Sequence, residues 1–106
     1  MDASLFKYAT TSRGLKYHYY FSPAQPSKAT LLFCHGFPSR ALDWRRIAPF
    51  FKDRGYGVLA VNQLGFHDTA QPTDAGAYVP SLLAKDFIDI LDAEKLDRVI
   101  AVGHDW

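Results

Sequence analysis

The sequence predicts an α/β fold in which parallel strands alternate with helices. Three short apolar runs without polar alternation, at 29–34, 57–61 and 99–102, have the pattern of strands covered on both faces. The segments between these runs have helical periodicity. A chain that alternates strand and helix in this way favours a parallel sheet with right-handed crossovers. No composition shift, repeat or low-complexity segment divides the 106 residues, so we assign them to one domain.

A β-hairpin is predicted at the start of the chain. Two β-prone runs, 6–11 and 15–21, are separated by Ser12-Arg13-Gly14, whose composition is typical of a tight turn. The second run alternates, with Leu15, Tyr17, Tyr19 and Phe21 in one set. The other set is expected to form a half-exposed face and contains Lys16, His18 and Tyr20.

Between the first two buried strands, the apolar spacing predicts two short helical pieces. Positions separated by i, i+3, i+4 and i+7 form one helical face, and they are Trp44, Ile47, Ala48 and Phe51. Pro49 would disturb a continuous helix, so we expect it to open a second one, which Gly55 would close.

A longer helix is predicted from Pro80 to Ala93. Its apolar stripe consists of Leu83, Phe87, Ile90 and Leu91. The solvent-facing side is expected to carry Lys85, Asp86, Asp89 and Asp92. The strand at 99–102 would follow, which completes a hairpin plus β-α-β-α-β arrangement.

Composition and charge point to a small-molecule ligand. The chain is 48% hydrophobic with a formal net charge of +1, and its acids and bases are interspersed, so no basic face is available for nucleic acid. Cys34 is the single cysteine, which excludes an internal disulfide and is compatible with a reducing compartment. With no run near the roughly 20 apolar residues of a membrane span, we expect a cytoplasmic protein; composition predicts no oligomeric state.

The residues that directly follow each buried strand are the candidates for chemistry, because open α/β sheets bind ligands beyond the carboxyl ends of their strands. These are 35–38, 62–69 and 104–106. In the last of them, Gly103-His104-Asp105-Trp106 has the form of a nucleophile elbow, in which a strand turns sharply into a helix. The four scattered histidines and one cysteine have no metal-ligand spacing, so neither a metal nor a cofactor is predicted.

Several of these motifs together resemble an α/β-hydrolase of the epoxide hydrolase group. They are His35-Gly36-Phe37-Pro38, Trp44-Arg45, Leu64-Gly65-Phe66 and Gly103-His104-Asp105-Trp106. The resemblance implies the strand order 1-2-4-3-5, with the strand at 99–102 as an unprotected edge. It also implies that residues 1–106 are the N-terminal portion of one hydrolase domain. The cap, its tyrosines, the general base and its acidic partner would lie beyond Trp106.

By this resemblance, Asp105 is the catalytic nucleophile. A carboxylate needs no base to be ionised near neutral pH, so Asp105 could attack an epoxide carbon and form an alkyl ester, which water would hydrolyse to a diol. The backbone N–H groups of Phe37 and Trp106 would stabilise the tetrahedral oxyanion of the second step. The substrate, expected to be an apolar epoxide, would contact His35, Pro38 and Trp106.

Some of these residues could have a structural role instead of a role in catalysis or binding. Asp105 could instead cap the following helix. His35 is expected to brace the segment 35–38 rather than act as a base, and Trp44 to pack in the core with Arg45 on the surface rather than line a pocket. Two positions depart from the family pattern and put the turn after the strand 57–61 in question: Asn62 stands where Asp is common, and His67 where Gly is common.

Other functions remain open from the sequence. Haloalkane dehalogenases use the same Asp-Trp pair, although that family places Asn where this chain has Phe37. Fluoroacetate dehalogenases share His-Gly-Phe-Pro, but they follow the nucleophile with Arg, where this chain has Trp106. The 106 residues could also be a catalytically incomplete unit, because a strand that is apolar on both faces has an unpaired edge and no helix to cover it. In that case Asp105 could form the ester but turnover would stall.

Overall fold

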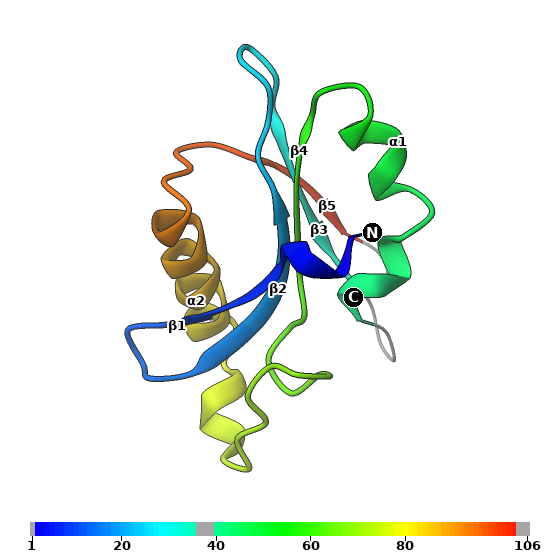
Figure 1. Ribbon diagram of the computed structural model, residues 1–106. Helices are drawn as coiled ribbons and strands as arrows, with labels where there is room; N and C mark the ends of the chain where they lie inside the picture. Colours follow the sequence, from blue (N-terminus) through cyan, green and yellow to red (C-terminus); the bar gives the residue numbers. More distant parts are fainter. Residues whose placement is uncertain (1, 36–39, 104–106) are drawn as a thin grey trace.

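The computed structural model describes residues 2–35 and 40–103, which form a mixed sheet with helices on both faces (Figure 1). The sheet order is β1-β2-β4-β3-β5. Its strands are β1 (Phe6–Thr10), β2 (Lys16–Ser22), β3 (Thr30–Cys34), β4 (Gly57–Val61) and β5 (Ile100–Gly103). β1 and β2 are antiparallel, as are β2 and β4, whereas β3 is parallel to both β4 and β5. The predicted fold class, hairpin and strand order are confirmed.

The hairpin closes where the sequence predicts it. The Thr11 N–H donates to Leu15 O at 2.9 Å, and Gly14 N–H donates to Thr11 O at 2.9 Å. Gly14 has a φ of +79°, in the left-handed region that glycine adopts without a steric penalty. Before β1, Ala3–Leu5 forms the short 3-10 helix η1.

Two short helical pieces join β3 to β4, as predicted. The 3-10 helix η2 spans Ala41–Trp44, and α1 spans Ala48–Lys52 with Pro49 in its first turn. Gly55, at a φ of +89°, follows the end of α1. Because η2 and α1 are separate helical pieces and not one continuous helix, Ile47 does not lie on the predicted apolar face and is 47% exposed. Trp44 is buried against Phe33, with ring centroids 4.8 Å apart, and Arg45 is exposed, so their predicted packing roles are confirmed.

The helix α2 spans Pro80–Ala93, with the predicted bounds, and the 3-10 helix η3 (Ala75–Tyr78) precedes it. One of its residues corrects the prediction, since Asp86 has no exposed surface. Asp86 lies three residues after Leu83 and four before Ile90, so helical geometry turns it toward the sheet. There its carboxylate accepts hydrogen bonds from Arg13 Nε at 3.0 Å and Tyr17 OH at 2.7 Å.

Asp89 is also less exposed than predicted. Its carboxylate accepts hydrogen bonds from the N–H (3.0 Å) and the hydroxyl (2.9 Å) of Ser12, and pairs with Lys85 Nζ at 2.8 Å. Lys85 and Asp92 are exposed as expected. Asp86 and Asp89 therefore fasten the hairpin turn to α2.

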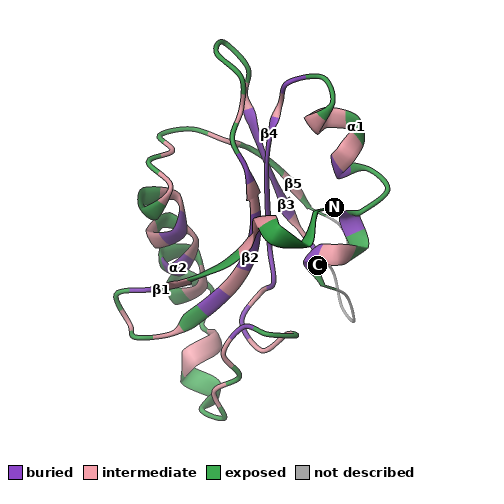
Figure 2. Ribbon diagram, viewed as in Figure 1, coloured by how far each residue is buried: buried purple, intermediate pink, exposed green. Residues whose placement is uncertain are grey.

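The core lies on both faces of the sheet, and β4 is buried along its whole length (Figure 2). One cluster packs under η2 and α1 and includes Tyr20, Phe33, Trp44 and Val58. Another packs under α2 and includes Tyr17, Tyr19, Leu59 and Ile90. Tyr20 was predicted on a half-exposed face but is 1% exposed, because η1, β1 and α1 cover that end of β2 and Lys52 Nζ donates to its hydroxyl at 3.3 Å.

β5 holds its predicted edge position but is less buried than its composition predicts. Ile100 is 52% exposed, and Ala101 and Gly103 are exposed as well. Within the described residues, β5 has β3 as its neighbour on one side and no strand on the other. An apolar strand sequence predicts what a strand can bury, whereas actual burial depends on the neighbours that it has.

Candidate active site

The carboxyl ends of β3, β4 and β5 meet at one edge of the sheet. Cys34, the last residue of β3, is in register with Val61 at the end of β4 and with Gly103 at the end of β5. The segments that follow these strands therefore start side by side. The structure brings together the origins of the three segments, 35–38, 62–69 and 104–106, that the sequence singled out.

Four of the predicted site residues lie outside the described residues. They are Phe37, Pro38, Asp105 and Trp106. Their roles as nucleophile, oxyanion donors and substrate contacts stay predictions. The described residues on either side of them define what holds this edge together.

His35 is buried directly after β3, with 4% of its surface exposed. Its Nε2 accepts a hydrogen bond from the backbone N–H of Gln63 at 3.0 Å, and its carbonyl oxygen accepts one from the Gln63 side-chain amide. The imidazole also packs edge-to-face on Phe66, with ring centroids 5.0 Å apart. Because Nε2 is an acceptor, it is unprotonated in this arrangement, and His35 joins the end of β3 to the turn after β4. Its predicted bracing of the segment 35–38 stays a prediction. Its predicted contact with substrate remains a prediction.

Asn62 joins three parts of the chain at the end of β4 and is 1% exposed. Its Oδ1 accepts from the N–H of Ala41, at the start of η2, at 2.7 Å. Its Nδ2 lies 2.8 Å from Nδ1 of His18 on β2. Its carbonyl oxygen accepts from the Thr69 hydroxyl at 2.6 Å, and that hydroxyl oxygen accepts from His18 N–H at 2.9 Å. The turn after β4 is therefore tied to β2 and η2.

The departure at His67 is accommodated by a left-handed backbone. His67 has a φ of +51°, and Gly65, two residues earlier, has a φ of +88°. Non-glycine residues visit this region uncommonly, although Asn, Asp and His do so more often than others. Position 67 therefore has the left-handed backbone conformation for which Gly is suited, and in this chain His67 adopts it.

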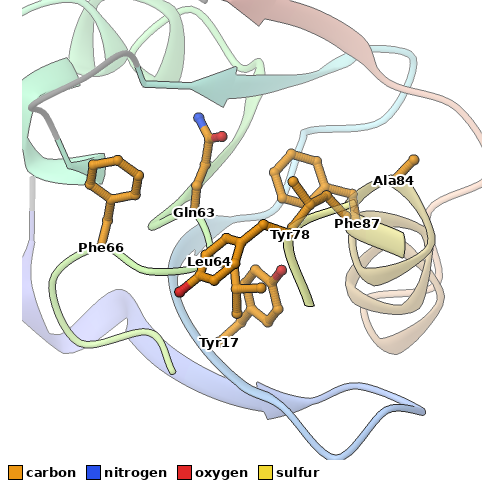
Figure 3. A pocket seen from close by; sticks show the side chains of 8 residues that line it. Tyr17, Gln63, Leu64, Phe66, Tyr78, Ala84 and Phe87 are labelled. Atoms are coloured by element: carbon orange, nitrogen blue, oxygen red, sulfur yellow. The ribbon is translucent and has the colours of Figure 1, made fainter. Parts of the chain in front are cut away.

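A cavity of about 290 Å³ opens beside this edge, between the turn after β4, η3 and α2 (Figure 3). Its walls include Leu64, Phe66, Tyr78 and Phe87, with Tyr17 at its base. Gln63 lines the cavity and also contacts His35, so the cavity borders the edge where the predicted site lies. Sequence reasoning had placed Phe87 in the core stripe of α2, without indicating a cavity.

Three groups near this edge have shifted pKa values. Burial raises the pKa of the Cys34 thiol. Burial and the hydrogen bond to Asp86 raise the pKa of Tyr17 far above its ordinary value. For His18, burial lowers the pKa, the nearby Asp68 carboxylate opposes this, and His67 adds to it, so that the pKa lies below 6.5.

Sequence reasoning missed the part played by Asn62 and Gln63. Asn62 was noticed as a departure from a family pattern, and Gln63 was not singled out. The signal available was their position directly after a buried strand; their partners, Ala41 and His35, are remote in sequence.

Within residues 2–35 and 40–103, no group of three or more His, Cys, Asp or Glu side chains could hold a metal ion. In the same residues, every helix is too short or too polar to cross a membrane.

Comparison with known proteins identifies relatives of this arrangement. The family described as alpha/beta hydrolase fold matches residues 29–106. An epoxide hydrolase of Caballeronia sordidicola is 35% identical over 100 residues, covering 94% of this chain and 30% of the relative. Epoxide hydrolase A of Mycobacterium tuberculosis is 37% identical over 82 residues, covering 77% of this chain and 26% of the relative. The chain thus spans less than a third of the length of these curated relatives.

Solved structures of epoxide hydrolases superpose on this chain. A Vigna radiata epoxide hydrolase mutant superposes with a TM-score of 0.86 at 29% identity, over 95% of this chain and 30% of that one. Epoxide hydrolase A from Mycobacterium thermoresistibile gives a TM-score of 0.85 at 28% identity, over 95% of this chain and 31% of that one.

Proposed function

Because the chain belongs to the alpha/beta hydrolase fold family, we propose that it supplies the nucleophile and the oxyanion donors of an epoxide hydrolase. The observation that carries this proposal is the register of Cys34 with Gly103. Because of this register, the segment that contains Phe37 and the segment that contains Asp105 follow the ends of two adjacent parallel strands, β3 and β5. The similarity to proteins named epoxide hydrolases supports the choice of an epoxide as substrate.

In the first proposed step, a carboxylate oxygen of Asp105 attacks one carbon of the epoxide. A C–O bond of the ring breaks, and the released alkoxide takes up a proton, which leaves an alkyl ester on the enzyme. An ionised carboxylate suffices for this attack near neutral pH, because an Asp side chain ordinarily titrates near pH 3.9.

In the second step, water attacks the ester carbonyl and the diol departs. The developing oxyanion would receive hydrogen bonds from the backbone N–H groups of Phe37 and Trp106, and removal of one such donor typically slows an enzyme about 10²- to 10³-fold. This step needs a general base. We assign none among the described residues, and His35 is unsuited because its Nε2 already accepts from Gln63 N–H. The 106 residues alone should therefore accumulate the ester rather than turn over.

The substrate class is tested on a longer chain that also supplies the general base, by incubating it with epoxides, chloroalkanes and fluoroacetate and measuring diol and halide. Diol from epoxides is the expected result. Halide release without any diol would instead support a dehalogenase.

In the same longer chain, the covalent route is tested by mass spectrometry of the Asp105 carboxylate after many turnovers in heavy-oxygen water. Label should enter this carboxylate, because the attacking water places its oxygen there. Asp105→Asn should abolish rapid ester formation, whereas Asp97→Asn, at an exposed position before β5, should leave it unchanged. Label found in the diol alone after many turnovers would exclude the mechanism.

A further inference from the structure

The cavity between the turn after β4, η3 and α2 combines aromatic walls with an amide oxygen. Its volume is about 290 Å³, and four rings line it, those of Tyr17, Phe66, Tyr78 and Phe87. Figure 3 shows Gln63 on one side of it and Ala84 and Phe87 on the other, with the Gln63 amide oxygen directed toward them. We propose that the cavity binds a neutral aromatic alcohol, whose rings lie between these walls and whose hydroxyl donates to Gln63 Oε1.

Hydrogen-bond direction fixes which end of the Gln63 amide faces the cavity. The His35 carbonyl oxygen can only accept, so the Gln63 atom that contacts it is the nitrogen Nε2, and Oε1 is the atom left for the cavity. The backbone N–H of Gln63 also donates to His35 Nε2 at 3.0 Å. Because these two bonds hold the residue, Oε1 is fixed before a ligand arrives, which reduces the conformational entropy lost on binding.

The hydroxyl groups of the two lining tyrosines are engaged elsewhere. Tyr17 OH donates to Asp86 Oδ2 at 2.7 Å, and Tyr78 OH donates to Pro72 O at 2.8 Å. A hydroxyl has a single hydrogen, so neither tyrosine also donates to Gln63 Oε1. Within residues 2–35 and 40–103, no other side chain or backbone group donates to this oxygen. Its donor must therefore come from water or from a ligand.

The size and the walls of the cavity indicate the shape of the ligand. An apolar cavity of about 150 Å³ holds one benzene ring, so 290 Å³ has room for two fused rings. Aromatic pairs gain stability in edge-to-face and offset arrangements beyond the burial of their surface. With Phe66 and Phe87 among the walls, an aromatic ring system should bind more tightly than a saturated one of the same size.

The ligand should carry no charge. None of the described residues that line the cavity is charged, and the Asp86 carboxylate behind Tyr17 is already paired with Arg13. An ionised ligand would lose its hydration in this cavity without gaining an opposite charge. A phenol-type hydroxyl, which ordinarily titrates near pH 10, is neutral at pH 7 and can donate.

The hydrogen-bond requirement separates this ligand from the proposed substrate. An epoxide oxygen accepts hydrogen bonds but has no hydrogen to donate. An apolar epoxide in the cavity would displace water from Gln63 Oε1 and leave that acceptor unpaired, which is unfavourable. The cavity therefore favours a molecule of another class, and the proposal does not depend on epoxide hydrolysis.

The first experiment compares 2-naphthol with 2-methoxynaphthalene, which has the same rings but no donor. Each is titrated into the 106-residue chain, and binding is followed by NMR chemical shifts and by the fluorescence of the ligand. One molecule of 2-naphthol should bind per chain, about two- to twelvefold more tightly than 2-methoxynaphthalene, the range that one neutral hydrogen bond supplies. Nuclear Overhauser contacts should connect its ring protons with Leu83 and Phe87. Equal affinities, or contacts with another part of the chain, would overturn the proposal.

The second experiment removes the acceptor. Gln63→Met keeps the length of the side chain and the backbone N–H bond to His35, but it has no amide oxygen. In this variant the two ligands should bind equally well. Gln71→Met is the matched control, because Gln71 is an exposed glutamine whose amide donates to His67 O at 2.9 Å, outside the cavity. A preference for 2-naphthol that persists in Gln63→Met would show that Oε1 is not its acceptor.

The third experiment fills the cavity. Ala84 lines it from an exposed position of α2, so Ala84→Phe adds a ring there without displacing the core. This variant should lose binding of both ligands. Ile88→Phe adds a ring at a position that is 50% exposed on the same helix and does not line the cavity, and it should bind as the unmodified chain does. Unchanged binding in Ala84→Phe would overturn the location of the site.

A longer chain that continues beyond Trp106 tests the other occupant of such a cavity, a later segment of the same protein. It should bind 2-naphthol with the same preference over 2-methoxynaphthalene. If the 106-residue chain binds 2-naphthol and the longer chain does not, the cavity is a packing surface for that segment and the proposal fails. Binding needs no turnover, so absence of epoxide hydrolysis in the same longer chain would count against the proposed function alone.

Discussion

The Arg13 guanidinium reaches the Asp86 carboxylate across 73 residues of sequence, with Nε 3.0 Å from Oδ1. Asp86 is fully buried, and Arg13 Nη1 also donates to Ala77 O at 3.1 Å, so one side chain joins the hairpin turn, η3 and α2. A buried carboxylate without its partner is strongly unfavourable, whereas replacing both members of such a pair by apolar residues is often neutral.

We therefore expect Arg13→Leu to lower the melting temperature more than the double variant Arg13→Leu/Asp86→Leu. Thermal unfolding followed by circular dichroism measures both. A double variant less stable than the single one would show that Asp86 stabilises the fold without Arg13, through the hydrogen bond that it accepts from Tyr17 OH.

Acid should unfold the protein partly through Asp89. The hydrogen bond from Lys85, followed by those from Ser12, lowers the pKa of Asp89 from 3.8 to about 2. Because the folded state holds the ionised form more strongly, this contribution to stability is present above pH 3.8 and is lost as the pH falls toward 2. The difference in melting temperature between the unmodified chain and Asp89→Asn should therefore shrink over this range.

Asp92→Asn is the control for that experiment, because Asp92 is exposed on the same helix. It removes a carboxylate from α2 while the contacts of Asp89 with Ser12 and Lys85 stay in place. A gap for Asp89→Asn that widens in acid would contradict the assignment.

The packing of α2 predicts unequal effects for two isoleucines that are two residues apart. Ile90 is 1% exposed and lies in the cluster beneath the helix, whereas Ile88 is 50% exposed. Ile90→Ala should lower the free energy of unfolding by about 2–5 kcal/mol through lost burial and a residual cavity. Ile88→Ala should change it by about 0.5 kcal/mol or less. Urea denaturation with an unchanged m-value measures both, and equal losses would mean that α2 does not pack as described.

Local sequence signals predicted those parts of the fold that depend on neighbouring residues. Pro49 and Gly55 placed the start and end of α1, and Pro80 placed the start of α2, because each acts through its own backbone. Asp86 was placed wrongly because its burial depends on Arg13, which no periodicity within α2 can indicate. A charged residue on the apolar side of a helix is a sign that a partner should be sought elsewhere.

The candidate site divides in the same way. The motif around His35 could be found from sequence because its residues are contiguous. The contacts of Asn62 and Gln63 could not, because Asn62 meets Ala41 and His18 through the sheet order, and Gln63 meets His35 across adjacent strands. The strand order 1-2-4-3-5 in the sheet places β4 between β2 and β3. Residues that follow β4 are therefore neighbours of residues from β2 and of those that follow β3.

The edge of β5 predicts how the 106-residue chain behaves when made by itself. In the described part of the chain this strand has a free edge and carries Ile100, which is 52% exposed. A flat apolar edge is a template for pairing with another chain, and a charged side chain on such a strand opposes that pairing. We expect the chain to self-associate at micromolar concentration and Ile100→Lys to reduce this association, as measured by sedimentation velocity. Lys85→Ile, which adds an exposed apolar residue on α2 away from the strand, should not reduce it. A monomer with a sharp thermal transition at low concentration, and no response to Ile100→Lys, would show that the β5 edge is protected.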